Sequence, residues 1–184
     1  RKIVKRTVVI FCIGLFLNLL AKSVFAHHLN FEEWRYLGVM QRLAIGYGVT
    51  SLVAITVRHK YFPVIILVTL AAYFLLLAAG DGFNLSETNI VARFDAWALG
   101  TSHMYHEGGM AFDPEGLLST VPAVCHVMVG FYCGKLLFSA KDNGEKIQRL
   151  FLVGTILTFA GFLLSYGCPI NKKVWSPTFV ITTC

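Results

Sequence analysis

Five mostly apolar stretches, each long enough to cross a bilayer as a helix, constrain the fold of this chain more than any other feature. They cover residues 7–25, 36–57, 61–80, 117–138 and 150–169, and a sixth, cut short, covers 177–184. An α-helix needs about 20 such residues to span the hydrocarbon core. The stretches lack the apolar–polar alternation of membrane β-barrel strands. The sequence therefore predicts an all-α, polytopic transmembrane helical bundle with five full spans and the start of a sixth.

The composition excludes other classes of protein. Only 14% of the 184 residues are charged, whereas soluble domains average about 25%. Disorder is excluded because Leu, Ile, Val and Phe are abundant. A disulfide-rich secreted scaffold is excluded because five cysteines are few and odd in number. We expect one transmembrane domain over 1–184, as the central fragment of a longer protein, because the chain starts at Arg1 and ends in a cut-off element.

Basic residues divide unequally between the two ends of this predicted bundle. Ten Lys and Arg fall at one end and five at the other, while most acids fall at the second end. The positive-inside rule then places the end that holds Arg1 in the cytoplasm. We expect the loops 26–35, 81–116 and 170–176 to face outward, with 81–116 as the long loop. We expect a multi-pass protein of the inner or plasma membrane. The short loops favour a bacterial protein.

Three local signals mark helix starts. Asp113 followed by Pro114 and Glu115 predicts an N-cap, a proline in the first turn and an acid near the helix dipole. Ser176 before Pro177 predicts the start of the sixth helix. Residues 30–33 resemble a capping box ahead of the second helix.

Arg42 is the charge that the predicted bundle places inside the membrane. Such a charge costs about 2.5–3.5 kcal/mol and usually faces a cavity or a partner. Two interpretations stay open: it holds a substrate group, or it forms a structural ion pair with Asp113 or Glu115. The two carboxylates could themselves act as a base or sugar ligands, or merely begin a helix.

Histidines in the long loop raise two further alternatives. His103 and His106 are three residues apart, but no third ligand is suitably spaced, so we expect no metal site. A proton shuttle at His106 is the more favoured role. The pair at 27–28 is expected in the outer headgroup zone. No motif supports nucleic-acid binding.

Three segments in register resemble the heparan-α-glucosaminide N-acetyltransferase family and its bacterial relatives. Residues 38–44, GVMQRLA, resemble that family's GVLQR(I/L)A segment, and 112–120, FDPEGLLST, resemble its (Y/F)DPEG(I/L)L(S/G)T segment. Residues 130–136 fit the glycine and lysine pattern that follows. Residues 169–176, PINKKVWS, are similar to its P(I/V)NK-containing segment that ends in WS. Order, spacing and placement in the membrane match over nearly the whole chain.

The resemblance implies a membrane acetyltransferase that moves an acetyl group from cytosolic acetyl-CoA to an amino sugar, such as glucosamine, or a glycan on the outer side. It implies that the family's catalytic histidine lies upstream of Arg1, so this fragment alone is expected to be inactive. Seven residues take substrate-binding roles by the same resemblance: Gln41, Arg42, Asp113, Glu115, Asn171, Lys172 and Trp175. The partners expected are membrane lipid, the acceptor sugar and further copies of the chain. A sugar or solute transporter with the same fold is the alternative, since fold does not fix function.

Overall fold

The computed structural model describes residues 1–26, 31, 34–140 and 142–184, with the main chain only at 25–26. Helices dominate, and the strands form one two-stranded antiparallel hairpin. In chain order the elements are α1 (Lys2–Ala26), α2 (Val39–Thr56), the 3-10 turn η1 (His59–Tyr61), α3 (Phe62–Ala79), α4 (Ile90–Leu99), the 3-10 turn η2 (Thr101–His103), β1 (His106–Glu107), β2 (Met110–Ala111), α5 (Leu117–Ser139), α6 (Asn143–Leu164) and α7 (Pro177–Thr183). The predicted all-α class is confirmed.

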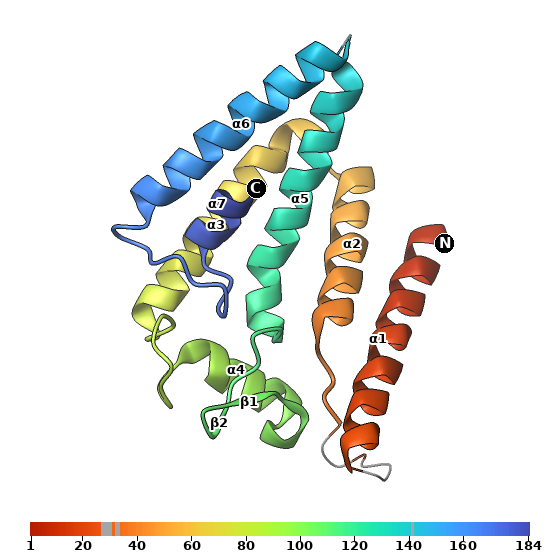
Figure 1. Cartoon of the computed structure of the whole chain (residues 1–184), viewed down its shortest axis with the longest axis vertical. Helices are drawn as coiled ribbons and strands as arrows, with labels where there is room; N and C mark the ends of the chain where they lie inside the picture. The colour runs from red at the N-terminus through yellow and green to blue at the C-terminus, as the bar shows by residue number, and fades with distance from the viewer. Residues whose placement is uncertain (27–30, 32–33, 141) are drawn as a thin grey trace.

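Five helices in the described part of the chain are long and apolar enough to cross a membrane. These spans are Lys2–Val24, Val39–Thr56, His59–Ala79, Leu117–Ser139 and Asn143–Leu164. Successive spans run in opposite directions, so the segment before α2, the α3–α5 connection and the α6–α7 connection gather at one end of the molecule (Figure 1). We call this the connection end. The chain is therefore a multi-pass helical membrane protein.

Helix α6 begins and ends earlier than the predicted 150–169. The side chain of Asp142 accepts a hydrogen bond from the backbone N–H of Glu145 at 2.8 Å, which caps the helix. Glu145 then pairs with Arg149 one turn later, at 2.6 Å. Capping and an i,i+4 ion pair both stabilise helical turns. Residues 143–149, which precede the predicted span, are therefore the first two turns of α6.

The connection 81–116 is folded rather than an extended loop, because α4 lies across the connection end (Figure 1). Asn89 begins this helix: its side-chain oxygen accepts from the backbone N–H groups of Val91 (2.8 Å) and Ala92 (3.3 Å). Its amide nitrogen donates to the carbonyl of Asn84 at 2.6 Å. The turns η2 and β1–β2 follow. The prediction of one long loop over 81–116 is therefore incomplete, because the segment contains a helix.

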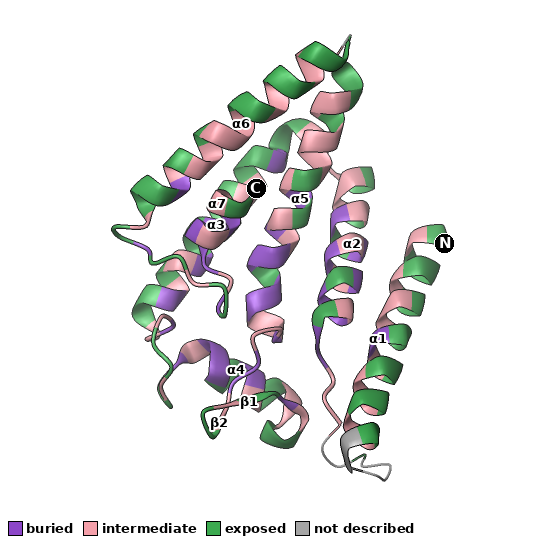
Figure 2. Cartoon of the chain, in the orientation of Figure 1, coloured by how far each residue is buried: buried purple, intermediate pink, exposed green. Residues whose placement is uncertain are grey.

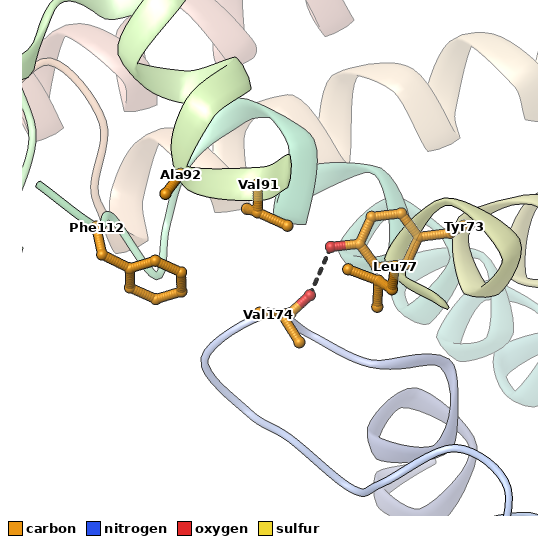
Figure 3. Close-up of a cluster of buried hydrophobic side chains, with 6 residues drawn as sticks. All are labelled: Tyr73, Leu77, Val91, Ala92, Phe112 and Val174. Carbon is orange, nitrogen blue, oxygen red and sulfur yellow. Dashed lines mark hydrogen bonds between the residues drawn. The ribbon is translucent and has the colours of Figure 1, made fainter. Parts of the chain in front are cut away.

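A buried apolar cluster joins these connections to the bundle. It comprises Tyr73, Leu77, Val91, Ala92, Phe112 and Val174 (Figure 3). Tyr73 of α3 donates from its hydroxyl to the carbonyl of Val174 at 2.7 Å, which fixes the α6–α7 connection to α3. By contrast, α1 and α6 are largely exposed along their length (Figure 2). The well-packed part of the molecule thus lies at the connection end and in the adjacent halves of α2, α3 and α5.

The predicted N-cap at Asp113 is wrong, although the predicted start of the span at residue 117 is confirmed. Helix α5 begins at Leu117, with Gly116 as its N-cap residue. The carboxylate of Asp113 accepts instead from the backbone N–H of Glu115 at 3.0 Å, within a tight turn that precedes the helix. The start predicted at Ser176 is confirmed, because its hydroxyl accepts from the N–H of Phe179 at 3.2 Å. The capping box at 30–33 and the histidines at 27–28 lie outside the described residues.

Candidate functional site

Arg35, just before α2, holds both carboxylates of the turn that precedes α5. Its Nε donates to Asp113 Oδ2 at 3.0 Å, and its Nη2 donates to Asp113 Oδ1 at 2.6 Å and to Glu115 Oε2 at 2.5 Å. The Asp113 side chain is fully buried, whereas that of Glu115 is 23% exposed. Burial acts to lower the pKa of Arg35, but the hydrogen bonds and charges of the two carboxylates outweigh it and raise that pKa. The guanidinium therefore stays charged.

Arg42 lies in the first turn of α2 and is 7% exposed. Its Nη2 donates to the carbonyl oxygen of Pro114 and to Ser119 Oγ, both at 2.5 Å. Its guanidinium lies over the ring of Trp175, with Cζ 4.5 Å from the ring centroid. Among the ion pairs between described residues, none includes Arg42. Of the two interpretations left open for Arg42, the direct ion pair with Asp113 or Glu115 is thus not formed, because Arg35 occupies both carboxylates.

Asp95 of α4 is a buried acid that the sequence analysis did not select. Its Oδ1 accepts from the backbone N–H of Leu118 at 3.2 Å, so a side chain from α4 caps the N-terminus of α5. A Cβ at Gly116 would lie 1.7 Å from Asp95 Oδ2, so only glycine fits there. Oδ2 itself has no hydrogen-bond partner in the described part of the chain. Burial raises the pKa of Asp95 to about 6, against the opposing effect of the Leu118 N–H.

Three side chains from separate elements therefore fix the segment 113–119. Arg35 holds its carboxylates, Arg42 holds the Pro114 carbonyl and Ser119, and Asp95 holds the start of α5. Arg35 and Asp95 could not be found from the spacing of motifs alone. The apolar periodicity after Asn89, an N-capping residue, would have signalled α4 and with it a buried position at 95.

The α6–α7 connection presents Trp175 to Arg42. Trp175 has φ +54°, in the left-handed region that non-glycine residues rarely adopt. Asn171 and Ser176 close the loop around it: Asn171 N donates to Ser176 Oγ and Ser176 N donates to the Asn171 carbonyl, each at 2.9 Å. Lys172 is exposed on the loop. Asn171 therefore shapes the loop, while Trp175 points its ring at the bundle.

Arg42 and Trp175 line one pocket of about 230 Å³ between α2, α5 and this loop. His126 of α5 lines it as well, and its ring centroid lies 6.2 Å from that of Trp175. The remaining lining is apolar: Val39, Leu43, Ala123 and Val127. Two buried donors, Arg42 Nε and Trp175 Nε1, have no partner among the described residues. The pocket thus combines an apolar wall with a histidine ring, and the Arg42 and Trp175 side chains that line it each keep one buried donor without a partner among the described residues.

Gln41 lies away from this pocket, at the contact between α1 and α2. A Cβ at Gly14 of α1 would lie 2.9 Å from the Gln41 amide nitrogen, and one at Gly38 would lie 3.3 Å from its oxygen. Its amide is fully buried and has no hydrogen-bond partner in the described chain. The helices therefore close tightly around Gln41.

The two histidines of the α4–α5 connection take different positions. His103 stacks on Tyr36, with ring centroids 4.1 Å apart, and both its ring nitrogens are within hydrogen-bond distance of a partner. His106 is exposed in β1, where it pairs with Ala111. It lines a separate pocket of about 420 Å³ that Arg35 and Tyr105 also line. Within the described ranges no group of three or more His, Cys, Asp or Glu residues is placed to hold a metal ion.

Comparison with known proteins finds two relatives of stated activity. Mouse heparan-α-glucosaminide N-acetyltransferase is 31% identical over 108 residues, which cover 48% of this chain and 16% of the mouse enzyme. The human enzyme is 29% identical over the same extent. The chain thus spans about a sixth of the length of these relatives. No protein-family model matches it. Over about half of its length, this chain is therefore a distant relative of the heparan-α-glucosaminide N-acetyltransferases.

Proposed function

We propose that this chain is part of a membrane N-acetyltransferase, in which it binds the reacting groups at the connection end. The activity proposed is transfer of an acetyl group from cytosolic acetyl-CoA to an amino sugar or glycan on the outer side of the membrane. Its relationship to two N-acetyltransferases and its multi-pass helical fold support this assignment.

The pocket with two unpartnered donors carries the proposal. Arg42 Nε and Trp175 Nε1 are buried polar groups, and leaving such groups unpaired costs about 1–3 kcal/mol each. That cost is recovered when a ligand supplies an acceptor oxygen. Acetyl-CoA would supply the acetyl group as a thioester, whose carbonyl oxygen is such an acceptor. The donor set therefore fits a carbonyl group.

The surroundings of Arg42 suit stabilisation of developing negative charge. Its guanidinium is held by the Pro114 carbonyl, by Ser119 and by the Trp175 ring, so it needs little reorganisation. Fixed donors in a pocket of low polarity stabilise an oxyanion more than mobile ones in water do. The lining of the pocket is mostly apolar, and a site of low polarity that holds little water protects a thioester from hydrolysis. A thiolate leaving group needs little acid assistance, because thiols ionise near pKa 8.5.

Acetyl transfer by the full-length protein tests the proposal directly. The protein is reconstituted into vesicles, supplied with labelled acetyl-CoA and glucosamine, and assayed for labelled N-acetylglucosamine. We expect product from the wild type and about 100-fold less from Arg42→Lys, which keeps the charge and loses the forked donors. Arg93→Lys, an exposed change on α4, serves as the matched control and should keep activity.

The same vesicles separate the enzyme from the transporter alternative. Labelled glucosamine is added outside, and both accumulated sugar and acetylated sugar are measured. Acetylated product with no accumulation of free sugar supports the transferase. Accumulation of unmodified sugar without label transfer from acetyl-CoA would reject it.

A further inference from the structure

A basic groove lies between the first turns of α1 and the middle of α2. It has a volume of about 690 Å³ and is lined by Lys2, Lys5, Arg6, Val9, Ile10 and Tyr47. These residues take no part in the proposed acetyl transfer. The groove lies beside the middle of α2, where Tyr47 stands, whereas Arg42 of the candidate site lies in the first turn of that helix; in Figure 1 the start of α1 is level with the middle of α2.

The cations of the groove have no acidic or hydrogen-bonding partner among the described residues. Within the described part of the chain, the side chains of Lys2, Lys5 and Arg6 form no ion pair and no hydrogen bond. All three are exposed. The first turns of α6 differ: Arg149 pairs with Glu145, and Lys146 donates to the side chain of Asn143. The first turns of α1 therefore carry three basic side chains without an acidic partner among the described residues, on the helix face that lines the groove.

Along α1, basic side chains are followed by apolar ones, which is the order of charged head and apolar tail in an amphiphile. Lys2, Lys5, Arg6, Val9 and Ile10 follow i, i+3, i+4, i+7 and i+8 spacing, so they share one face of the helix. The first turns of that face are basic, and the next turn, about 6 Å deeper, is apolar. Tyr47 of α2 closes the other side of the groove with an aromatic ring and a hydroxyl.

We propose that this groove binds an anionic phospholipid. The phosphate headgroup would lie against Lys2, Lys5 and Arg6, and the upper part of an acyl chain would lie against Val9 and Ile10. Basic pockets between transmembrane helices bind anionic headgroups in this way. The apolar continuation of the groove favours a lipid over a free phosphate, which would leave Val9 and Ile10 without contact. The proposal is independent of the acetyltransferase assignment.

Thermal unfolding of the full-length protein in a neutral detergent tests the site. Phosphatidylglycerol or phosphatidylcholine is added in a titration, and the unfolding midpoint is followed. We expect phosphatidylglycerol to raise the midpoint and phosphatidylcholine to have little effect. The double variant Lys5→Gln/Arg6→Gln should need about 30-fold more phosphatidylglycerol for the same shift, from the loss of two charges at the surface.

The matched control is Arg58→Gln/Lys60→Gln, which removes two basic charges from the α2–α3 connection and none from the groove. It should respond to phosphatidylglycerol as the wild type does. Equal losses in the two double variants, or equal shifts with the two lipids, would overturn the proposal. So would full protection by inorganic phosphate alone. If the groove variant fails to fold, the phosphatidylglycerol titration of the wild type is repeated in about 1 M salt. The Debye length is then about 3 Å, so screening should abolish the shift in the unfolding midpoint.

Discussion

Arg35 binds Asp113 through two parallel hydrogen bonds, Nε to Oδ2 at 3.0 Å and Nη2 to Oδ1 at 2.6 Å. The two residues are 78 positions apart in sequence, and the pair joins the segment before α2 to the segment before α5. Because the Asp113 side chain is fully buried, its charge depends on this partner. The pair therefore sets the geometry of the turn that Arg42 holds from its other side.

Replacement of Arg35 by Gln should destabilise the protein by about 3 kcal/mol. The change leaves the buried carboxylate of Asp113 without its counter-charge, and breaking such a pair costs about 3–5 kcal/mol. The lower end applies because Arg35 itself is 26% exposed. Chemical unfolding of the full-length protein in micelles measures the effect. The double variant Arg35→Gln/Asp113→Asn should recover much of the loss, and an equal loss in both would show that the ion pair is not the cause.

Replacement of Arg42 by Lys should lower kcat more than it changes KM. Lysine keeps the positive charge but has no planar group to lie over the Trp175 ring while it bonds Pro114 and Ser119. Loss of one fixed donor to a developing oxyanion typically costs about 100-fold in kcat. Steady-state acetyl transfer measures both constants. A rise in KM with kcat unchanged would instead place Arg42 in ground-state binding only.

Replacement of Gly116 by Ala should destabilise the protein by about 1–3 kcal/mol, because the new Cβ would overlap the Asp95 carboxylate. Gly130 in α5 is the matched control, since a Cβ there meets nothing within 4 Å. Alanine at 130 should leave stability unchanged or raise it slightly, as alanine favours helix. Unfolding midpoints of the two variants give the comparison. Similar midpoints for both would contradict the close contact between Gly116 and Asp95.

Asp95 should make stability fall as pH rises from about 4 to about 6. Its folded-state pKa of about 6 lies above the ordinary value of 3.8, so the folded protein binds the proton more tightly than the unfolded chain. The stabilisation is therefore fully present below pH 3.8 and is lost as pH passes 6. Two pKa units correspond to about 3 kcal/mol.

The variant Asp95→Asn isolates this effect, because an amide oxygen can still accept from Leu118 N but carries no charge. The difference in unfolding free energy between variant and wild type, measured from pH 4 to pH 8, should favour the variant increasingly up to about pH 6 and then level off. A difference that is constant with pH would mean that Asp95 does not change its protonation in this range.

The sequence alone predicted the membrane-spanning helices and their all-α class, because long apolar runs have few stable alternatives in a bilayer. The start of α7 was also predicted, because Ser176 and Pro177 signal a helix start locally. The helix α4 was missed because its apolar face spans only ten residues and packs on elements distant in the chain. The early start of α6 was missed because the capping and pairing of Asp142, Glu145 and Arg149 override a polar composition.

The choice between Arg35 and Arg42 as the partner of Asp113 was decided only by the tertiary structure. Both arginines belong to one segment in the sequence, and either could reach a carboxylate in principle. The direction in which α2 enters the bundle brings Arg35 to the carboxylates and leaves Arg42 between Pro114 and Trp175. The sequence determined which charged groups lie near the membrane. The meeting of α2, α4, α5 and the Trp175 loop determined which of them pair and which donors remain unused, because side-chain pairing depends on the packing of elements far apart in the chain.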